Sequence, residues 1–116
     1  MYFWASWCGV CDADAESLVA LQEDPEWQGV SFVGVATSDS RQDILESNKL
    51  EKKQFLNLID SDGIVSTALG VDSLPATLLV DASGHVRYRV KGRLIGPSLM
   101  MLARELENIS KETPND

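Results

Sequence analysis

Cysteine and histidine are scarce in this chain, whose 116 residues include two cysteines and one histidine. Because Cys8 and Cys11 lie in one short stretch, no thiol remains for a separate structural disulfide. A structural zinc site uses four protein ligands, and the cysteines and the histidine together supply only three. His85 also follows a turn glycine, so we expect it to be exposed and not to bind a metal.

The chain also lacks a long apolar run and an excess of positive charge. No apolar stretch approaches the roughly 18 residues needed to cross a bilayer. The apolar segment that begins at Met1 is too short for a signal peptide and lacks the basic residues that lead one. The net charge of −8, with scattered Lys and Arg, argues against a nucleic-acid partner. A hydrophobic content of 44% fits one compact domain, predicted over residues 1–112 with a frayed tail at 113–116.

Alternating and periodic apolar residues predict an α/β fold with a central mixed sheet flanked by helices. The pattern places strands at residues 2–5, 30–36, 55–59, 77–80 and 85–90, and helices at 9–23, 40–45, 64–69 and from 97 onward. The turn residues 81–84 are typical of a hairpin, so the last two strands should run antiparallel. This order of elements indicates a single α/β domain.

The two cysteines are separated by Gly9 and Val10 and stand where a short apolar strand feeds a helix. This spacing suits an intramolecular disulfide that opens and closes. If the helix begins at Gly9, Cys8 is its N-cap, and the N–H groups of Val10 and Cys11 point at the Cys8 sulfur. These donors and the positive end of the helix lower the pKa of the Cys8 thiol.

Three acids on the same helix, Asp12, Asp14 and Glu16, act against a thiolate at Cys8. Each charge opposes it by roughly 1 kcal/mol or less at a surface-like dielectric. The pKa of Cys8 should therefore be only moderately lowered. Because a strong oxidant needs a stabilised thiolate, we expect a reducing couple.

The segments 3–11, 70–81 and 84–87 together resemble the thioredoxin fold, and within it the TlpA/ResA-like thiol–disulfide oxidoreductases, which include the cytochrome c maturation thioredoxins. The resemblance implies that Pro75 is cis and lies against the disulfide, and that Ser73 and Leu74 pair with an extended substrate segment. It also implies that Trp7, Gly9 and Val10 form the substrate surface around the cysteines. No cofactor is implied.

The sequence departs from this family at four positions and at its beginning. The family usually has Pro at position 10, Glu at 14 and Pro at 16, where this chain has Val10, Asp14 and Glu16, and thioredoxins have an acid where Tyr2 stands. Met1 also falls inside the strand that leads to the cysteines. We therefore expect that the chain is an N-terminally truncated form of a longer protein.

The chemistry expected is thiol–disulfide exchange. Cys8 attacks a substrate disulfide and forms a mixed disulfide, which Cys11 then resolves. Asp14, three residues after Cys11 on the helix, is the better candidate for taking the Cys11 proton, and Glu16 is the second. Trp7 and Trp4 are expected to wall the site, with Tyr2 and Phe3 in the core.

Partners and location follow from the resemblance. The expected partners are disulfide-containing protein substrates and a dithiol electron donor, which is soluble or membrane-bound. The full-length protein is expected to be periplasmic, or membrane-anchored outside the cytoplasm. A cytoplasmic location is the alternative, since a lone CxxC occurs in both kinds of compartment.

Three other functions compete with the oxidoreductase. A copper-binding thioredoxin-like module usually has three residues between its cysteines, whereas this chain has two. A peroxidase needs Thr or Ser three residues before its cysteine, where Ala5 stands. A redox-inactive fragment is the third, because the central strand is short.

Overall fold

The computed structural model describes residues 1–37, 39–46 and 55–112. The predicted tail at 113–116 lies outside these residues. Within the described part, each strand and helix expected from the sequence is present, in the expected order.

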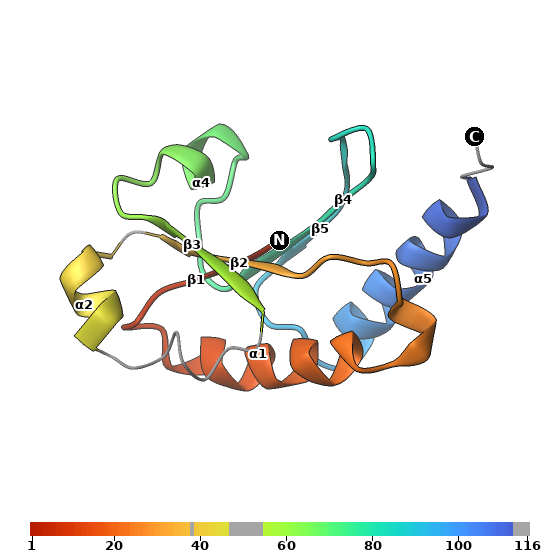
Figure 1. Ribbon diagram of the computed structural model, residues 1–116, viewed down its shortest axis with the longest axis horizontal. Helices are drawn as coiled ribbons and strands as arrows, with labels where there is room; N and C mark the ends of the chain where they lie inside the picture. Colours follow the sequence, from red (N-terminus) through yellow and green to blue (C-terminus); the bar gives the residue numbers. More distant parts are fainter. Residues whose placement is uncertain (38, 47–54, 113–116) are drawn as a thin grey trace.

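Among the described residues, a five-stranded mixed sheet forms the centre of the fold (Figure 1). Its strands lie in the order β3-β2-β1-β4-β5, with β1 parallel to β2, β2 parallel to β3, and both the β1–β4 and β4–β5 pairs antiparallel. The five strands are β1 (Tyr2–Trp4), β2 (Val33–Thr37), β3 (Leu56–Asp60), β4 (Ala76–Val80) and β5 (Val86–Lys91). The mixed α/β sheet predicted from the sequence is confirmed.

In the residues that the structure describes, four α-helices and one 3-10 turn surround the sheet. They are α1 (Gly9–Gln22), α2 (Arg41–Glu46), α4 (Ile64–Ala68), α5 (Pro97–Glu112) and the 3-10 helix η1 (Pro25–Trp27). In Figure 1, α1 and α5 lie on one side of the sheet and α4 lies on the other. Each face of the sheet is therefore covered.

The central strand β1 divides its side chains between two cores, because alternate residues of a strand point to opposite faces. Tyr2 and Trp4 join the larger buried cluster, which includes Cys11 and Leu18 of α1 and Leu102 of α5. Phe3 joins a smaller cluster with Val35, Ala76 and Leu78. The prediction that Tyr2 and Phe3 are core residues is confirmed.

The predicted strand at 30–36 begins three residues later than expected, at Val33. The Val30 amide donates to the Trp27 carbonyl at 3.2 Å, which keeps Val30 in the turn that follows η1. This turn bond is not visible in the apolar pattern of Val30–Phe32.

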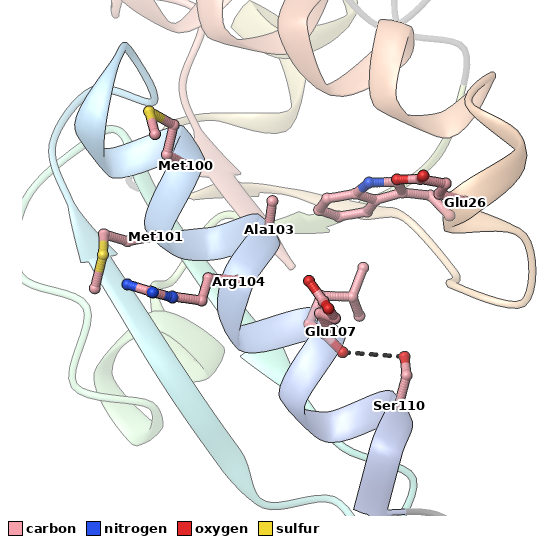
Figure 2. A pocket seen from close by; sticks show the side chains of 9 residues that line it. Glu26, Met100, Met101, Ala103, Arg104, Glu107 and Ser110 are labelled. Carbon is pink, nitrogen blue, oxygen red and sulfur yellow. Dashed lines mark hydrogen bonds between the residues drawn. The ribbon is translucent and has the colours of Figure 1, made fainter.

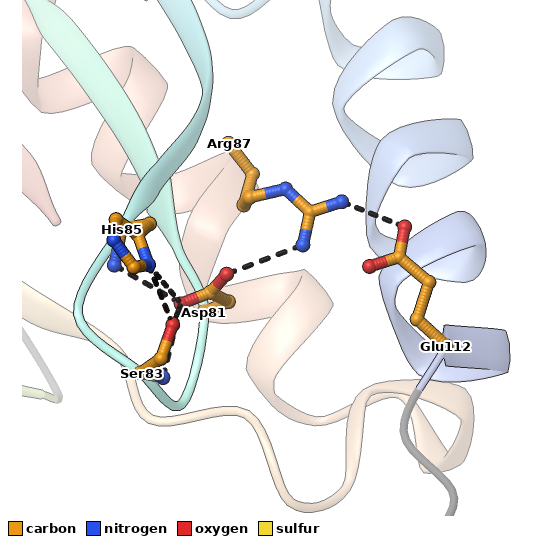
Figure 3. A network of polar contacts seen from close by, with 5 residues as sticks. All are labelled: Asp81, Ser83, His85, Arg87 and Glu112. Atoms are coloured by element: carbon orange, nitrogen blue, oxygen red, sulfur yellow. Dashed lines mark hydrogen bonds and ion pairs between the residues drawn. The ribbon is translucent and has the colours of Figure 1, made fainter.

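A polar network closes the β4–β5 hairpin and ties it to α5 (Figure 3). Asp81 Oδ1 accepts hydrogen bonds from the Ser83 hydroxyl (2.6 Å) and the His85 amide (3.0 Å). Arg87 then bridges Asp81 (3.2 Å) and Glu112 (2.6 Å). The hydrogen bonds from Ser83 and from the His85 amide hold the pKa of Asp81 below its usual value, with Arg87 contributing. As expected, His85 is exposed.

The buried carboxylate of Asp60 organises the start of α4. It accepts hydrogen bonds from the backbone amides of Val65 and Ser66, both at 3.0 Å, and from the Thr37 hydroxyl at 2.9 Å. Burial alone raises the pKa of Asp60, but these hydrogen bonds outweigh it and hold the pKa below its usual value. The charged form of Asp60 therefore stabilises the fold.

We expect Asp60→Asn to lower the free energy of unfolding by about 1–3 kcal/mol at pH 7, because the amide cannot accept all three hydrogen bonds. Since the folded-state pKa is depressed, this contribution is present above the unfolded value of about 4 and is lost as the pH falls through the folded value. Urea unfolding of both proteins between pH 7 and pH 3 should show the difference shrinking. Asp62→Asn, at an exposed turn position, is the matched control, and equal losses from both variants would contradict this role of Asp60.

Candidate active site

Cys8 and Cys11 form a disulfide at the N-terminal end of α1, with 5.4 Å between their Cα atoms. Cys8 is the N-cap residue of α1, as predicted. The loop before it is tight, since the Cys8 amide donates to the Ala5 carbonyl at 3.1 Å. Cys8 is 6% exposed and Cys11 is fully buried. Of the two disulfide-bonded residues, Cys8 is therefore the one with exposed surface.

The Cys8 side chain makes no capping hydrogen bond, and its Sγ is bonded to Cys11. The amides of Val10 and Cys11 were expected to donate to a Cys8 thiolate. That stays a prediction for the reduced protein. The Cys11 amide donates to the Cys8 carbonyl at 3.2 Å, so it faces the start of the helix in the oxidised state.

Apolar side chains are exposed on both sides of Cys8. Trp7 is 63% exposed and Val10 is 44% exposed, while Gly9 between the cysteines is also exposed. Trp4 differs from Trp7, because it is fully buried in the cluster that holds Cys8 and Cys11, and its Nε1 donates to Asn57 Oδ1 at 2.9 Å. Trp4 thus packs in the core that holds the disulfide, and Trp7 offers an exposed apolar surface next to Cys8 in the chain.

The peptide bond between Leu74 and Pro75 is cis. Phe3 pairs with Ala76, so the start of β4 lies beside the end of β1, the edge from which the cysteine loop departs. Leu74 packs against the cluster that contains Cys8 and Cys11, and Ser73 is exposed. The structure therefore brings the predicted proline loop and the disulfide to the same edge of the sheet.

Tyr2 has a contact to the site that the sequence did not predict. Its hydroxyl donates to the Cys11 carbonyl at 2.7 Å. Burial raises the pKa of Tyr2, and the charges of Asp14 and Asp12 raise it further. Tyr2 is therefore a neutral hydrogen-bond donor that fixes the first turn of α1.

The two predicted proton acceptors lie in different surroundings. Asp14 is buried on the same face of α1 as Cys11, whereas Glu16 is exposed. Both Asp14 oxygens are occupied: Oδ1 accepts from Arg93 Nε at 3.0 Å, and Oδ2 accepts from the Leu94 amide at 2.9 Å. The transfer of a Cys11 proton to Asp14 or Glu16 stays a prediction, and the Arg93 contact was not expected.

A second buried carboxylate, Asp39, also acts on the cysteine loop. Its Oδ2 accepts from the Ser6 amide at 2.6 Å. Asp39 follows β2, which is parallel to β1, so both strands end at the same edge of the sheet. The general rule that polar groups gather at the carboxyl ends of parallel strands could have identified this residue.

No group of three or more His, Cys, Asp and Glu side chains among the described residues has the arrangement of a metal site. In the same part of the chain, no helix has the length and apolar character needed to cross a membrane.

A groove of about 810 Å³ lies between η1 and α5, away from the cysteines (Figure 2). Its wall includes Trp27, the exposed Met100, and the charged Arg104 and Glu107. None of the residues that line this groove belongs to the predicted site.

A five-stranded mixed sheet, a CxxC disulfide at the start of α1 and a cis-proline at the start of β4 define a dithiol domain of the thioredoxin class. The sequence profile of the AhpC/TSA family matches residues 1–89, and the chain belongs to this family. The thioredoxin-like resemblance seen in the sequence is confirmed.

Known relatives include thiol–disulfide exchange proteins. The chain is 39% identical over 92 residues to the thiol:disulfide interchange protein DsbE of Yersinia pestis, covering 78% of this chain and 47% of that protein. DsbE of Escherichia coli K12 is 38% identical, with 78% and 48% covered. The chain thus spans about half the length of these DsbE proteins.

Solved structures agree with this assignment. A secreted Mycobacterium tuberculosis disulfide oxidoreductase, homologous to E. coli DsbE, superposes with a TM-score of 0.68 at 27% identity, covering 92% of this chain and 78% of that one.

Proposed function

We propose that this chain is a thiol–disulfide oxidoreductase that reduces disulfides in extended protein segments. The observation that carries the proposal is the Cys8–Cys11 disulfide at the N-terminal end of α1, with Cys8 on the accessible side and Cys11 buried. The similarity to DsbE proteins supports the same reaction class.

The reaction begins when the Cys8 thiolate attacks one sulfur of the substrate disulfide. A mixed disulfide forms, and the other substrate sulfur leaves as a thiolate. Cys11 then loses its proton and attacks Cys8 Sγ, which releases the second substrate thiol. Two electrons and two protons pass to the substrate, and a dithiol donor must reduce the Cys8–Cys11 disulfide before the next cycle.

The substrate surface consists of Trp7, Gly9 and Val10 on one side of the disulfide and Ser73 and Leu74 on the other. Exposed apolar side chains at Trp7 and Val10 favour a peptide with apolar residues near its cysteine. An extended segment beside Ser73 and Leu74 can bond through its backbone, which gives affinity with little sequence preference.

We expect a reduction potential between about −200 and −270 mV, near the reducing thioredoxins and far from the strong oxidants near −120 mV. Asp12, Asp14 and Glu16 on α1 disfavour a stabilised thiolate, which a strong oxidant requires. Equilibration with glutathione or thioredoxin, followed by tryptophan fluorescence, measures this potential. Catalysed reduction of an insulin disulfide by the reduced chain tests the activity.

Asp12→Asn provides an internal test, because the removal of one negative charge near α1 should make the potential less negative by up to about 20 mV. Glu107→Gln on α5, where Glu107 pairs with Lys111, should leave it unchanged. A wild-type potential near −120 mV would show that the chain is an oxidant, and failure to reduce insulin would overturn the proposed function.

The proposed location is outside the cytoplasm, in a full-length protein that is periplasmic or membrane-anchored. The Mycobacterium tuberculosis relative is described as secreted, which supports this location. The proposed partners of this chain are disulfide-containing proteins, which it reduces, and a dithiol electron donor, which reduces the chain again. Thiol–disulfide exchange requires both.

A further inference from the structure

The segment Gly92–Leu94, between β5 and α5, contacts both the cis-proline Pro75 and helix α1. The Gly92 amide donates to the Pro75 carbonyl at 2.9 Å. The next two residues bind Asp14 of α1, through the Arg93 guanidinium and the Leu94 amide. Gly92 has a φ of 96°, a left-handed conformation that favours glycine and lets the chain turn between these two contacts.

The Arg93–Asp14 pair is a partly buried ion pair with close contacts. Arg93 Nε and Nη2 both lie 3.0 Å from Asp14 Oδ1. The Asp14 side chain is 1% exposed and the Arg93 side chain is 39% exposed, so the carboxylate is desolvated and the guanidinium reaches it from the surface. The Ser98 hydroxyl donates to the Arg93 carbonyl at 2.7 Å, which fixes the backbone from which the side chain extends.

The charges of Arg93 and Asp14 both affect the pKa of Tyr2, which is bonded to the first turn of α1. Arg93 and Asp14 act in opposite directions on the Tyr2 hydroxyl, which donates to the Cys11 carbonyl. The titratable and charged groups on the described elements around the dithiol are Tyr2 of β1, Asp12, Asp14 and Glu16 of α1, Asp39 after β2, and Arg93 before α5. In this set Arg93 is the cation, and the carboxylate that it contacts is Asp14.

We propose that Arg93 is a positioning residue of the dithiol site, whose guanidinium offsets the buried charge of Asp14 and thereby favours the thiolate form of the Cys8–Cys11 dithiol. This inference rests on the proposed thiol–disulfide exchange function. Without the Arg93 charge, Asp14 stands uncompensated on the same helix face as Cys11 and opposes the negative charge that forms on sulfur. Arg93 touches neither sulfur, and its positive charge acts on the dithiol across space, opposite in sign to the charge of Asp14.

The thiolate absorbance of the reduced chain, followed against pH, tests this proposal directly. The first macroscopic pKa of the dithiol should rise by roughly 0.3–1 unit in Arg93→Gln, as expected for the loss of one unit charge near the dithiol. Arg93→Lys retains the charge and should keep the pKa within about 0.2 unit of the wild type. Arg104→Gln, on the outer surface of α5, is the control for net charge and should leave the pKa unchanged.

A second pair of variants avoids a buried, unpaired carboxylate. Asp14→Asn alone should lower the dithiol pKa, and Asp14→Asn with Arg93→Gln should raise it again by roughly 0.3–1 unit. Equal values for these two proteins, or an Arg93→Gln value that matches Arg104→Gln, would show that Arg93 has only a structural role. The titration needs no substrate, so a chain that fails to reduce insulin can still confirm or refute the role of Arg93.

Discussion

Replacing Cys8 with serine is expected to lower the rate of insulin disulfide reduction at least roughly 1,000-fold, because a hydroxyl cannot form the mixed disulfide. Cys8 is the N-cap of α1 and is partly accessible, whereas Cys11 lies one turn into the helix with no exposed surface. An incoming disulfide can therefore reach Cys8 but not Cys11. Turnover with dithiothreitol as the reductant measures this loss.

Cys11→Ser should also stop turnover, but at a later step. Cys8 still attacks, and no resolving thiol follows, so the mixed disulfide with the substrate should accumulate. A non-reducing gel and the mass of the intact adduct detect it, and a reductant should release it. Mapping the adduct to Cys8 would identify the attacking sulfur.

Two control measurements complete this test. The variant with both serines should form no adduct, and tryptophan fluorescence during urea unfolding should show that each variant is folded. An adduct in Cys8→Ser combined with none in Cys11→Ser would reverse the two roles. Unchanged insulin reduction by Cys8→Ser would exclude the mechanism.

Local patterns in the sequence predicted most of the fold, because the boundaries are marked by residues with strong local preferences. Helix α1 begins at Gly9 and ends just before Asp24-Pro25, and α4 ends before Gly70, which has a φ of 72°. The Ser40 hydroxyl accepts from the Asp43 amide at 3.0 Å and so caps the start of α2. The start of β2 was missed because the bond from Val30 to Trp27 extends the preceding turn.

For the site too, features within one segment were predicted from the sequence, whereas contacts between distant residues were not. Cys8 and Cys11 were recognisable because their spacing and their helix lie in one segment. The partner of Asp14 was not, since Arg93 is 79 residues away and meets it only when β5 and α5 are in place. The same holds for Ser6 and Asp39, which are 33 residues apart. Apolar periodicity predicts which face of a helix is buried but not which charge meets that face.

Gly34→Ala is expected to lower the free energy of unfolding by about 2–4 kcal/mol. A Cβ atom at Gly34 would lie 2.0 Å from Asn57 Oδ1 and 2.9 Å from Phe55 Cε1. Asn57 is held at both ends, since its Oδ1 accepts from Trp4 Nε1 and its Nδ2 donates to the Phe55 carbonyl, both at 2.9 Å. To make room, the amide must give up its bond to the indole of Trp4, which is buried in the same cluster as Cys8 and Cys11.

Urea unfolding followed by tryptophan fluorescence measures this loss, and Gly9→Ala is the matched control because a Cβ at Gly9 meets nothing within 4 Å. Asn57→Ala removes the obstructing side chain, so Gly34→Ala should cost less in that background than in the wild type. The remaining loss then reports the contact with Phe55. If Gly34→Ala is no more destabilising than Gly9→Ala, Asn57 can move freely, and the bond from Trp4 to Asn57 contributes little to the support of the disulfide.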